Sequence, residues 1–263
     1  MWRFIKKAAL VVFALFVGWL VYEVVTFPRV AALKTKNPET TSMIEARLRE
    51  ARREGREPRR VQQWVPLERI SPHLQRAVLA GEDSNFATHD GFDYAAIQKA
   101  WEEARREAER EAKEEGETPE ESWIPPMPSF KRGASTITQQ LAKNLYLSEE
   151  RSFTRKIREA FLTYFLERTL PKRRILEIYL NVIEWGDGVY GAEAAARTYF
   201  NKSAADLSPR EAAFLAAMIP NPRAVFNPQP TAQNPKSNLR RVQRRQRVIL
   251  RGMNSVRLPP GTG

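Results

Sequence analysis

The chain has 263 residues, of which 42% are hydrophobic, and its formal charge is +12 at neutral pH. This length suffices for one sizeable core, or for one domain together with a membrane segment. Cysteine is absent, which excludes a disulfide framework and a thiolate metal site. Because only two histidines occur, His73 and His89, a histidine-based zinc centre is not expected.

The N-terminal residues indicate a membrane anchor. Residues 8–27 carry a single charge, Glu23, and as a helix would span about 30 Å, the thickness of a bilayer core. Three basic residues precede this run, which favours a cytoplasmic N-terminus. The alternative is a cleaved signal peptide, but the apolar run is longer than usual and no small-residue cleavage site follows it. We therefore predict an uncleaved single-pass anchor with the remaining chain outside the cytoplasmic membrane.

The segment after the anchor changes in composition twice. Residues 28–66 are polar, contain proline and include a short Arg/Glu-rich helical patch, so we expect a connector there. Beyond it, Ser71 followed by Pro72 is typical of a helix start. Residues 101–130 then interrupt the globular pattern with an acidic stretch and with "SWIPPMPSF". We interpret them as an insertion, in which a solvated helix precedes an irregular proline-rich segment.

The stretch "GASTITQQLAKN", residues 133–144, has a thin apolar stripe. Its other side chains are hydroxyls and amides around a single lysine, whereas a solvated helix face normally carries Glu, Lys and Arg. A capping box, Thr136 with Gln139, explains two of these polar residues. The remainder indicates a surface that binds a polar, anionic ligand.

Further helical patterns follow. "TRKIREAFLTYFLERT" places Phe161, Tyr164 and Phe165 on one side and Glu159 away from it. Residues 171–186 start with proline and end with glycine, the expected asymmetry of helix ends. "SPREAAFLAAMIP" opens with a capping box. Since no window shows sustained strand alternation, we predict a mainly α domain.

The C-terminal stretch 223–263 is strongly basic. An apolar stripe suggests a helix docked on the domain with a basic face towards anionic lipid; its members are Leu239, Val242, Ile249 and Met253. The alternative is a basic protein that binds nucleic acid or anionic lipid without catalysis, because Lys and Arg neutralise any phosphate. The predicted outward topology and the lack of a nucleic-acid motif argue against nucleic acid.

Two carboxylates are candidates for chemistry. Glu82 ends an apolar helix beside Gly81, and a partly shielded carboxylate next to another acid has a raised pKa, which suits acid–base catalysis. The alternative is that Glu82 and Asp83 simply bond turn amides and His89. Glu159 lies among basic residues, and its alternative is a surface pair with Arg155. Nearby cations suit a phosphate-bearing ligand; they are Lys143, Arg151, Arg155 and Lys156.

Five motifs resemble those of the peptidoglycan glycosyltransferases, in the family's order. "EDSNFATHDGFD" is similar to the first, "GASTITQQLAKN" to the second and "RKIRE" to the third. "KRRILEIYLNVIEWGDGVYG" resembles the fourth and "LSPREAAFLAAMIPNP" the fifth. Together they cover about residues 67–222. No S-x-x-K motif occurs, so the transpeptidase domain of bifunctional relatives is not expected and the chain resembles the monofunctional members.

The resemblance implies a lysozyme-like helical fold behind the single N-terminal transmembrane helix. It also implies polymerisation of lipid II into β-1,4-linked glycan strands at the outer face of the cytoplasmic (inner) membrane, with inversion at the donor carbon and release of undecaprenyl pyrophosphate. The domains expected are a cytoplasmic tail at 1–7, the anchor at 8–27, the connector at 28–66, the glycosyltransferase domain at 67–222 with its insertion at about 101–130, and a basic helix and tail at 223–263.

On the family pattern, Glu82 would be the general base that deprotonates the acceptor 4-hydroxyl. Glu159 would be the second catalytic carboxylate and would organise either a divalent metal, Mg²⁺ or Mn²⁺, or the cations that bind pyrophosphate; no organic cofactor is implied. Eight positions match residues that line the substrate cleft: Ser135, Thr136, Gln140, Lys143, Asn144, Arg151, Arg155 and Lys156. Three more would shape the site rather than react: Asp83, Phe86 and His89.

The partners implied are lipid II, the growing strand, membrane lipids, and proteins of cell-wall synthesis or division. Two departures from the family are Ala134, where glycine is frequent, and the long insertion, whose "SWIPPMPSF" we expect to dip into the membrane interface. A lysozyme-like hydrolase or lytic transglycosylase is the main alternative. Such an enzyme needs a general acid because its leaving alkoxide is poor, whereas pyrophosphate leaves readily when cations take its charge.

Overall fold

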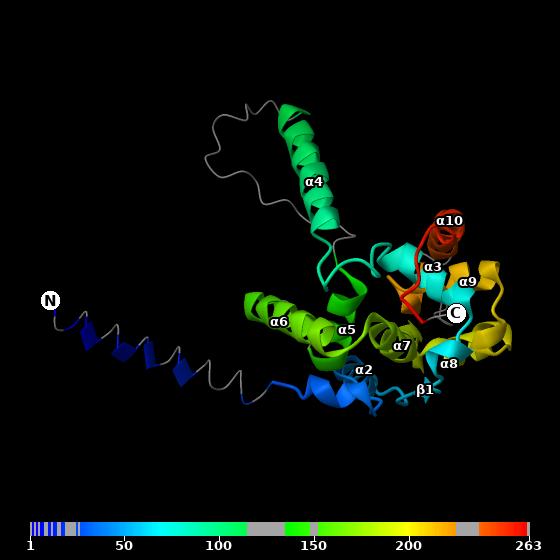
Figure 1. Ribbon diagram of the computed structural model, residues 1–263, viewed down its shortest axis with the longest axis horizontal. Helices are drawn as coiled ribbons and strands as arrows, with labels where there is room; N and C mark the ends of the chain where they lie inside the picture. Colours follow the sequence, from blue (N-terminus) through cyan, green and yellow to red (C-terminus); the bar gives the residue numbers. More distant parts are fainter. Residues whose placement is uncertain are drawn as a thin grey trace.

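The computed structural model describes residues 27–114, 135–147, 152–224 and 237–261, with scattered positions among the first 26. The architecture is mainly α, as predicted (Figure 1). Its α-helices are α2 (Ser42–Arg53), α3 (Pro72–Glu82), α4 (Tyr94–Glu114), α5 (Ile137–Tyr146), α6 (Phe153–Thr169), α7 (Lys172–Val182), α8 (Ala192–Phe200), α9 (Pro209–Met218) and α10 (Ser237–Gly252). Its strands are β1 (Val61–Gln62), β2 (Glu184–Gly186) and β3 (Val189–Tyr190), and short 3-10 helices cover Val30–Lys34, Leu67–Arg69, Ala204–Asp206 and Pro222–Ala224.

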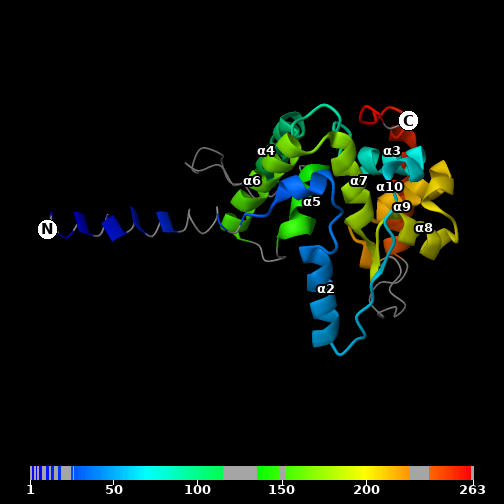
Figure 2. The same cartoon turned by 60° about the horizontal axis from the view of Figure 1, so that its bottom comes forward.

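The helices form two groups around one continuous apolar core. α3, α9 and α10 pack together on one side, and α5 packs against α6, α7 and α2 on the other (Figures 1 and 2). Trp185 and Tyr179 are the largest fully buried side chains, and burying aromatic rings of this size contributes heavily to the stability of a core.

Three helix starts follow from local sequence signals, and the predictions for them are confirmed. Ser71 caps α3, and Pro72 lies in its first turn, where its missing N–H costs no hydrogen bond. Thr136 and Gln139 form the capping box of α5, and Ser208 begins the capping box of α9. In each box the side chains satisfy backbone N–H groups that the first helical turn leaves unpaired.

The helix predicted for residues 171–186 is wrong at its end. α7 stops at Val182, and residues 184–186 form β2 instead. β2 runs antiparallel to β3, which is parallel to β1, so the sheet order is β1-β3-β2. These strands have only two or three residues, too few to show alternation in the sequence. The turn between β2 and β3 uses Gly188 with φ +71°, a conformation in which glycine avoids strain.

The segment expected as a connector, residues 28–66, is folded onto the domain. Ile44 and Ala51 of α2 are buried, and α2 packs against α5. β1 lies in the sheet, and the backbone of Val65 is held by the buried Asn181, whose side chain accepts from its N–H and donates to its C=O at 2.9 Å each. Residues of the 28–66 segment, in α2, β1 and Val65, are therefore part of the packed domain.

Two predicted segments lie largely outside the described residues. Most of the anchor predicted for residues 8–27 does so, and within the described part no helix combines the length and apolar character needed to cross a membrane. "SWIPPMPSF" of the insertion also lies outside it, together with Ala134. The described part of the insertion continues α4, which extends away from the other helices in Figure 1.

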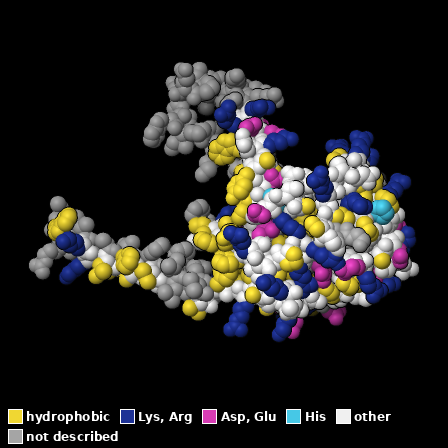
Figure 3. Space-filling model, in the orientation of Figure 1, with side chains coloured by type: hydrophobic (Ala, Val, Ile, Leu, Met, Phe, Trp, Pro, Cys, Tyr) yellow, Lys and Arg dark blue, Asp and Glu magenta, His cyan; other side chains and the backbone are white. Residues whose placement is uncertain are grey.

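α6 turns its aromatic side outwards. Phe161 is 57% exposed and Tyr164 48%, whereas Leu162 and Leu166 are buried. Phe165 is also exposed, and its ring packs against Phe27 with centroids 4.9 Å apart. In Figure 3 hydrophobic side chains gather where the N-terminal segment joins the domain. The side with Glu159 therefore faces the protein, and the aromatic side does not.

The buried amide of Asn181 supports a stability prediction. Asn181→Ala would leave the N–H and C=O of Val65 without their partners, and each unpaired buried group costs about 1–3 kcal/mol. We expect the free energy of unfolding, measured by denaturant titration, to fall by about 2–4 kcal/mol. Gln63→Ala, at an exposed position nearby, should change it by less than about 0.5 kcal/mol. Equal effects of the two variants would contradict this assignment.

Candidate active site

Glu82 is the last residue of α3, and its side chain is only 10% exposed. Its Oε1 accepts a hydrogen bond from Nη2 of Arg245 at 2.6 Å, and its Oε2 accepts one from Nε2 of Gln140 at 3.0 Å. The hydroxyl of Tyr179 donates to Oε1 of Gln140 at 2.8 Å, which fixes the amide with its nitrogen towards the carboxylate. Neither expected partner of Glu82, a turn amide or His89, is the one observed.

Burial is the largest influence on the protonation of Glu82. It raises the pKa of this carboxyl group, as the sequence predicted, because a charge loses favourable hydration when it leaves water. Arg245, Gln140 and Lys143 act in the opposite direction, through positive charge and hydrogen bonds to the carboxylate. The site therefore combines a shielded acid with groups that stabilise its ionised form.

Asp83 agrees with the alternative stated for it from the sequence, that it bonds backbone amides and His89. It is buried, and its Oδ2 accepts from the backbone N–H of Ile137 at 2.9 Å, at the start of α5. Both of its oxygens lie 3.0 Å from Nε2 of His89. The N–H of Gly91 donates to Nδ1 of His89 at 3.1 Å, so Nδ1 is the acceptor and Nε2 carries the hydrogen. Asp83 thereby ties the first motif to α5.

Phe86, the third residue expected to shape the site, is fully buried. The ammonium group of Lys172 lies 4.5 Å from the centre of its ring, a cation–π contact, and also pairs with Glu167 at 2.7 Å. Glu167 in turn accepts a hydrogen bond from the hydroxyl of Thr138 on α5. This buried cluster connects the loop after α3 with α5, α6 and α7.

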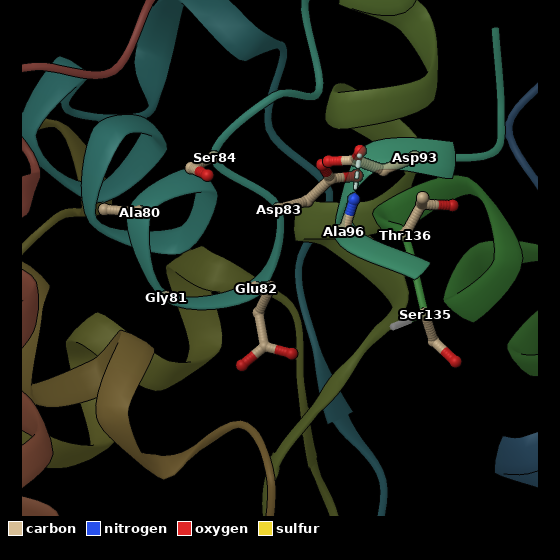
Figure 4. Close-up of a pocket in the computed structure, with 9 residues that line it drawn as sticks. All are labelled: Ala80, Gly81, Glu82, Asp83, Ser84, Asp93, Ala96, Ser135 and Thr136. Carbon is tan, nitrogen blue, oxygen red and sulfur yellow. Dashed lines mark hydrogen bonds between the residues drawn. The ribbon is translucent and has the colours of Figure 1, made fainter. Parts of the chain in front are cut away.

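A cavity of about 200 Å³ opens beside Glu82 (Figure 4). The lining residues come from the end of α3, from the start of α4 and from the approach to α5: Ala80, Gly81, Glu82, Asp83, Ser84, Asp93, Ala96, Ser135 and Thr136. In the figure the side chains of Glu82 and Ser135 extend towards the same side. Asp93 accepts from the N–H of Ala96 at 2.9 Å and from Asn85 at 2.8 Å.

The polar residues predicted on α5 divide into two groups. Thr136 is buried, and its hydroxyl accepts from the N–H of Gln139 and donates to the carbonyl of Gly91 at 2.7 Å. The hydroxyl of Thr136 is therefore occupied by hydrogen bonds within the fold, although Thr136 is one of the residues that line the cavity. Ser135 is exposed, and three others are partly exposed: Gln140, Lys143 and Asn144.

Glu159 is buried, with 4% of the residue exposed, so it is not the surface residue of the simple helix pair. Its Oε2 accepts from Nη1 of Arg155 at 3.3 Å, and its Oε1 from the ammonium group of Lys156. One turn later, Thr163 lies close to Gly91, where an added Cβ would come within 3.0 Å of its Cγ2. α5 packs against α6 and carries Gln140, so it connects the helix of Glu159 with Glu82. Arg151 lies outside the described residues.

The described residues do not fit a metal centre held by protein ligands alone. Both oxygens of Glu159 are bonded to basic side chains, and nowhere in the described ranges do three acidic or histidine side chains group as ligands. The divalent cation implied by the resemblance stays a prediction.

Three residues of the site were not singled out from the sequence. Tyr179 orients Gln140, Asp93 borders the cavity, and Arg245 pairs with Glu82. Asp93 stands at the end of the first motif and could have been chosen from it. Arg245 belongs to an arginine-rich helix whose inward-facing members depend on how that helix is packed.

The tautomer of His89 can be measured. Because the N–H of Gly91 points at Nδ1, ¹⁵N NMR of the imidazole should show a hydrogen on Nε2 and none on Nδ1. A His73→Gln variant, which removes the only other histidine, assigns the signals. A hydrogen found on Nδ1 would contradict the arrangement of Asp83, His89 and Gly91.

The chain is similar to a known protein family over most of its length. A family model described as Transglycosylase matches residues 49–116 and 126–254. The chain is 43% identical to the biosynthetic peptidoglycan transglycosylase of Thiobacillus denitrificans over 98% of both chains. It is 45% identical to the protein of that name from Azoarcus sp., over 85% of this chain and 87% of the relative. The corresponding Bordetella pertussis protein is 47% identical over 78% of each.

Proposed function

Because the chain belongs to the transglycosylase family, we propose that it polymerises lipid II into β-1,4-linked glycan strands and releases undecaprenyl pyrophosphate. The observation that carries the proposal is the shielded carboxylate of Glu82, next to a cavity and to cations of α5 and α10. The mainly helical architecture is compatible with a lysozyme-like fold.

In the proposed reaction Glu82 is the general base. Its carboxylate takes the proton of the acceptor sugar's 4-hydroxyl while that oxygen attacks carbon 1 of the donor. The bond from carbon 1 to the pyrophosphate oxygen breaks on the opposite face, so the α-linked donor gives a β-linked product. Pyrophosphate leaves with the bonding electron pair, and its charge is stabilised by basic side chains, for which we propose Lys143, Arg151, Arg155 and Lys156.

Glu159 supports this step by holding cations. Because it bonds both Arg155 and Lys156, it fixes two of these side chains where pyrophosphate would bind. Of the two roles implied for Glu159, this favours organising cations over holding a metal. Mg²⁺ or Mn²⁺ would add positive charge at the pyrophosphate. Ser135, Gln140 and Asn144 would orient the sugars through hydroxyl and amide groups.

A lytic transglycosylase or hydrolase is favoured less by these contacts. A general acid must hold a proton on one carboxyl oxygen and donate it to the leaving group. Both oxygens of Glu82 accept hydrogen bonds from N–H donors, one of them a guanidinium. Such a setting stabilises the carboxylate, which is the form that a base requires.

We also propose that the domain lies on the outer surface of the cytoplasmic membrane, anchored by residues 8–27. The exposed aromatic side of α6 continues towards the N-terminal segment through the contact of Phe165 with Phe27. An exposed apolar patch of this kind suits the interface of a bilayer, where the rings leave water and the tyrosine hydroxyl stays hydrated.

Glu82→Gln should slow polymerisation of lipid II by a factor of about 10² to 10⁴, because the amide has no basic oxygen for the proton. The measurement is the rate at which long glycan strands form from purified lipid II in the presence of Mg²⁺. Glu159→Gln should also slow the reaction, but less, since Arg155 and Lys156 would remain with weaker support.

Glu54→Gln is the control, because this carboxylate is exposed and its described partner is Arg56. It should polymerise at the wild-type rate. Equal rates for all variants would reject the assignment of the base, and shortening of preformed strands by the wild-type protein would favour the lytic alternative.

The membrane-facing side of α6 can be tested by site-directed labelling, because the chain has no cysteine. Phe161→Cys, labelled with a fluorophore in full-length protein reconstituted into vesicles, should be quenched by quenchers attached to the lipids. Asp206 is exposed on the 3-10 helix Ala204–Asp206, which packs against α8, and α8 lies away from α6 in Figure 1. A label at Asp206→Cys should therefore be quenched much less. Equal quenching at both positions would contradict the proposed orientation.

A further inference from the structure

A guanidinium from the far end of the chain reaches the proposed base. Arg245 lies on α10, 163 residues after Glu82, and its Nη2 donates to Oε1 of Glu82 at 2.6 Å. The same nitrogen donates to the carbonyl of Gly81 at 2.7 Å. The side chains of Arg245 and Glu82 are 33% and 10% exposed, so this pair is more shielded than an ordinary surface ion pair.

The packing of α10 holds this guanidinium in place. Val242, Ile249 and Met253 are buried in the same core as α3. A Cβ at Gly81 would lie 3.0 Å from Cδ1 of Ile249 and 3.6 Å from Nη2 of Arg245. α10 therefore sits about as close to the end of α3 as a glycine there permits, and the position of Arg245 is a consequence of apolar packing.

We propose that Arg245 is a positioning residue of the reaction: it keeps the carboxylate of Glu82 ionised and holds it in one orientation for the acceptor hydroxyl. This inference rests on the proposed role of Glu82 as the base. Two donors on different helices, Arg245 and Gln140, each bind one carboxylate oxygen, so the group has little freedom to rotate. Each oxygen retains a further lone pair that can accept the proton of a substrate hydroxyl.

The charges around Glu82 define what Arg245 contributes. The polar groups around it are Arg245 from α10, Lys143 and Gln140 from α5, and Tyr179 from α7. The adjacent Asp83 extends in a different direction in Figure 4. Burial raises the pKa of Tyr179 well above its usual value, so its hydroxyl keeps its hydrogen and acts as a donor to Gln140. Among the influences that lower the pKa of Glu82, the charge of Arg245 is the largest.

Loss of Arg245 should change the pH dependence of the reaction in a defined direction. Burial raises the pKa of Glu82 and the charge of Arg245 lowers it, so removing Arg245 should raise this pKa further. A base acts only when it is deprotonated, and the acid limb of the pH–rate profile must then move to higher pH. An opposite charge at this distance lowers a carboxyl pKa by about one unit or more, so a shift of about one pH unit is expected. A purely structural role would lower the rate equally at every pH.

The experiment compares pH profiles of lipid II polymerisation by full-length wild type, Arg245→Ala and Arg245→Lys. We expect the acid limb of the kcat profile to move up by about one pH unit in Arg245→Ala. The value of kcat should fall about tenfold at pH values below the limb and much less at pH values above it. Arg245→Lys should shift the limb less, because it keeps the charge. Gly81→Ala should shift it in the same direction as Arg245→Ala by displacing α10.

Arg247→Ala is the matched control, since it removes the same charge from an exposed position of the same helix and should leave the profile unchanged. Thermal unfolding establishes whether each variant is folded. If Arg245→Ala does not fold, Arg245→Lys and Gly81→Ala still test the positioning role of Arg245. An unshifted limb in the folded variants, or an equal shift in Arg247→Ala, would overturn the inference. Absence of polymer from the wild type would instead reject the proposed function.

Discussion

The shielding of one carboxylate, that of Glu82, is the constraint on which the arrangement of the site depends. A carboxylate that leaves water loses favourable hydration, and the protein must replace it with hydrogen bonds and positive charge. Here the replacements come from two different helices, Gln140 on α5 and Arg245 on α10. α3, α5 and α10 must therefore meet at one point, and their packing against α7 and α9 fixes that point.

The unusual composition of α5 follows from the same constraint. One set of its polar side chains, Thr136, Thr138 and Gln139, is buried and connects the helix with the first motif and with Glu167. Another set, which includes Gln140 and Lys143, faces Glu82. Additional Glu or Lys in place of the first set would bury unpaired charges, and apolar residues would break the connections. Hydroxyl and amide side chains meet both demands.

Local signals in the sequence were sufficient for some features. The capping boxes at Thr136 and Ser208 depend on residues three positions apart, so they can be predicted without knowledge of the fold. The end of α7 could not be predicted, because β2 exists only by pairing with β3, which also pairs with β1 from the segment expected as a connector. The sequence also could not decide which side of α6 is buried, because one side is aromatic and another carries Leu162 and Leu166.

Only one half of the pair formed by Glu82 and Arg245 could be predicted from the sequence. The sequence identified the acid from its position at a helix end, but several arginines of α10 have similar neighbours, and only packing turns one of them inward. At the end of α3 the unpaired carbonyl groups already carry partial negative charge, which adds to the cost of a carboxylate there. One guanidinium nitrogen of Arg245 stabilises both the helix-end carbonyl and the carboxylate, because it donates to the carbonyl of Gly81 and to Glu82. A guanidinium presents its N–H donors in a fixed planar fork, whereas a lysine ammonium sits on a flexible stem, so arginine suits a site where donors must stay aimed at two neighbouring oxygens.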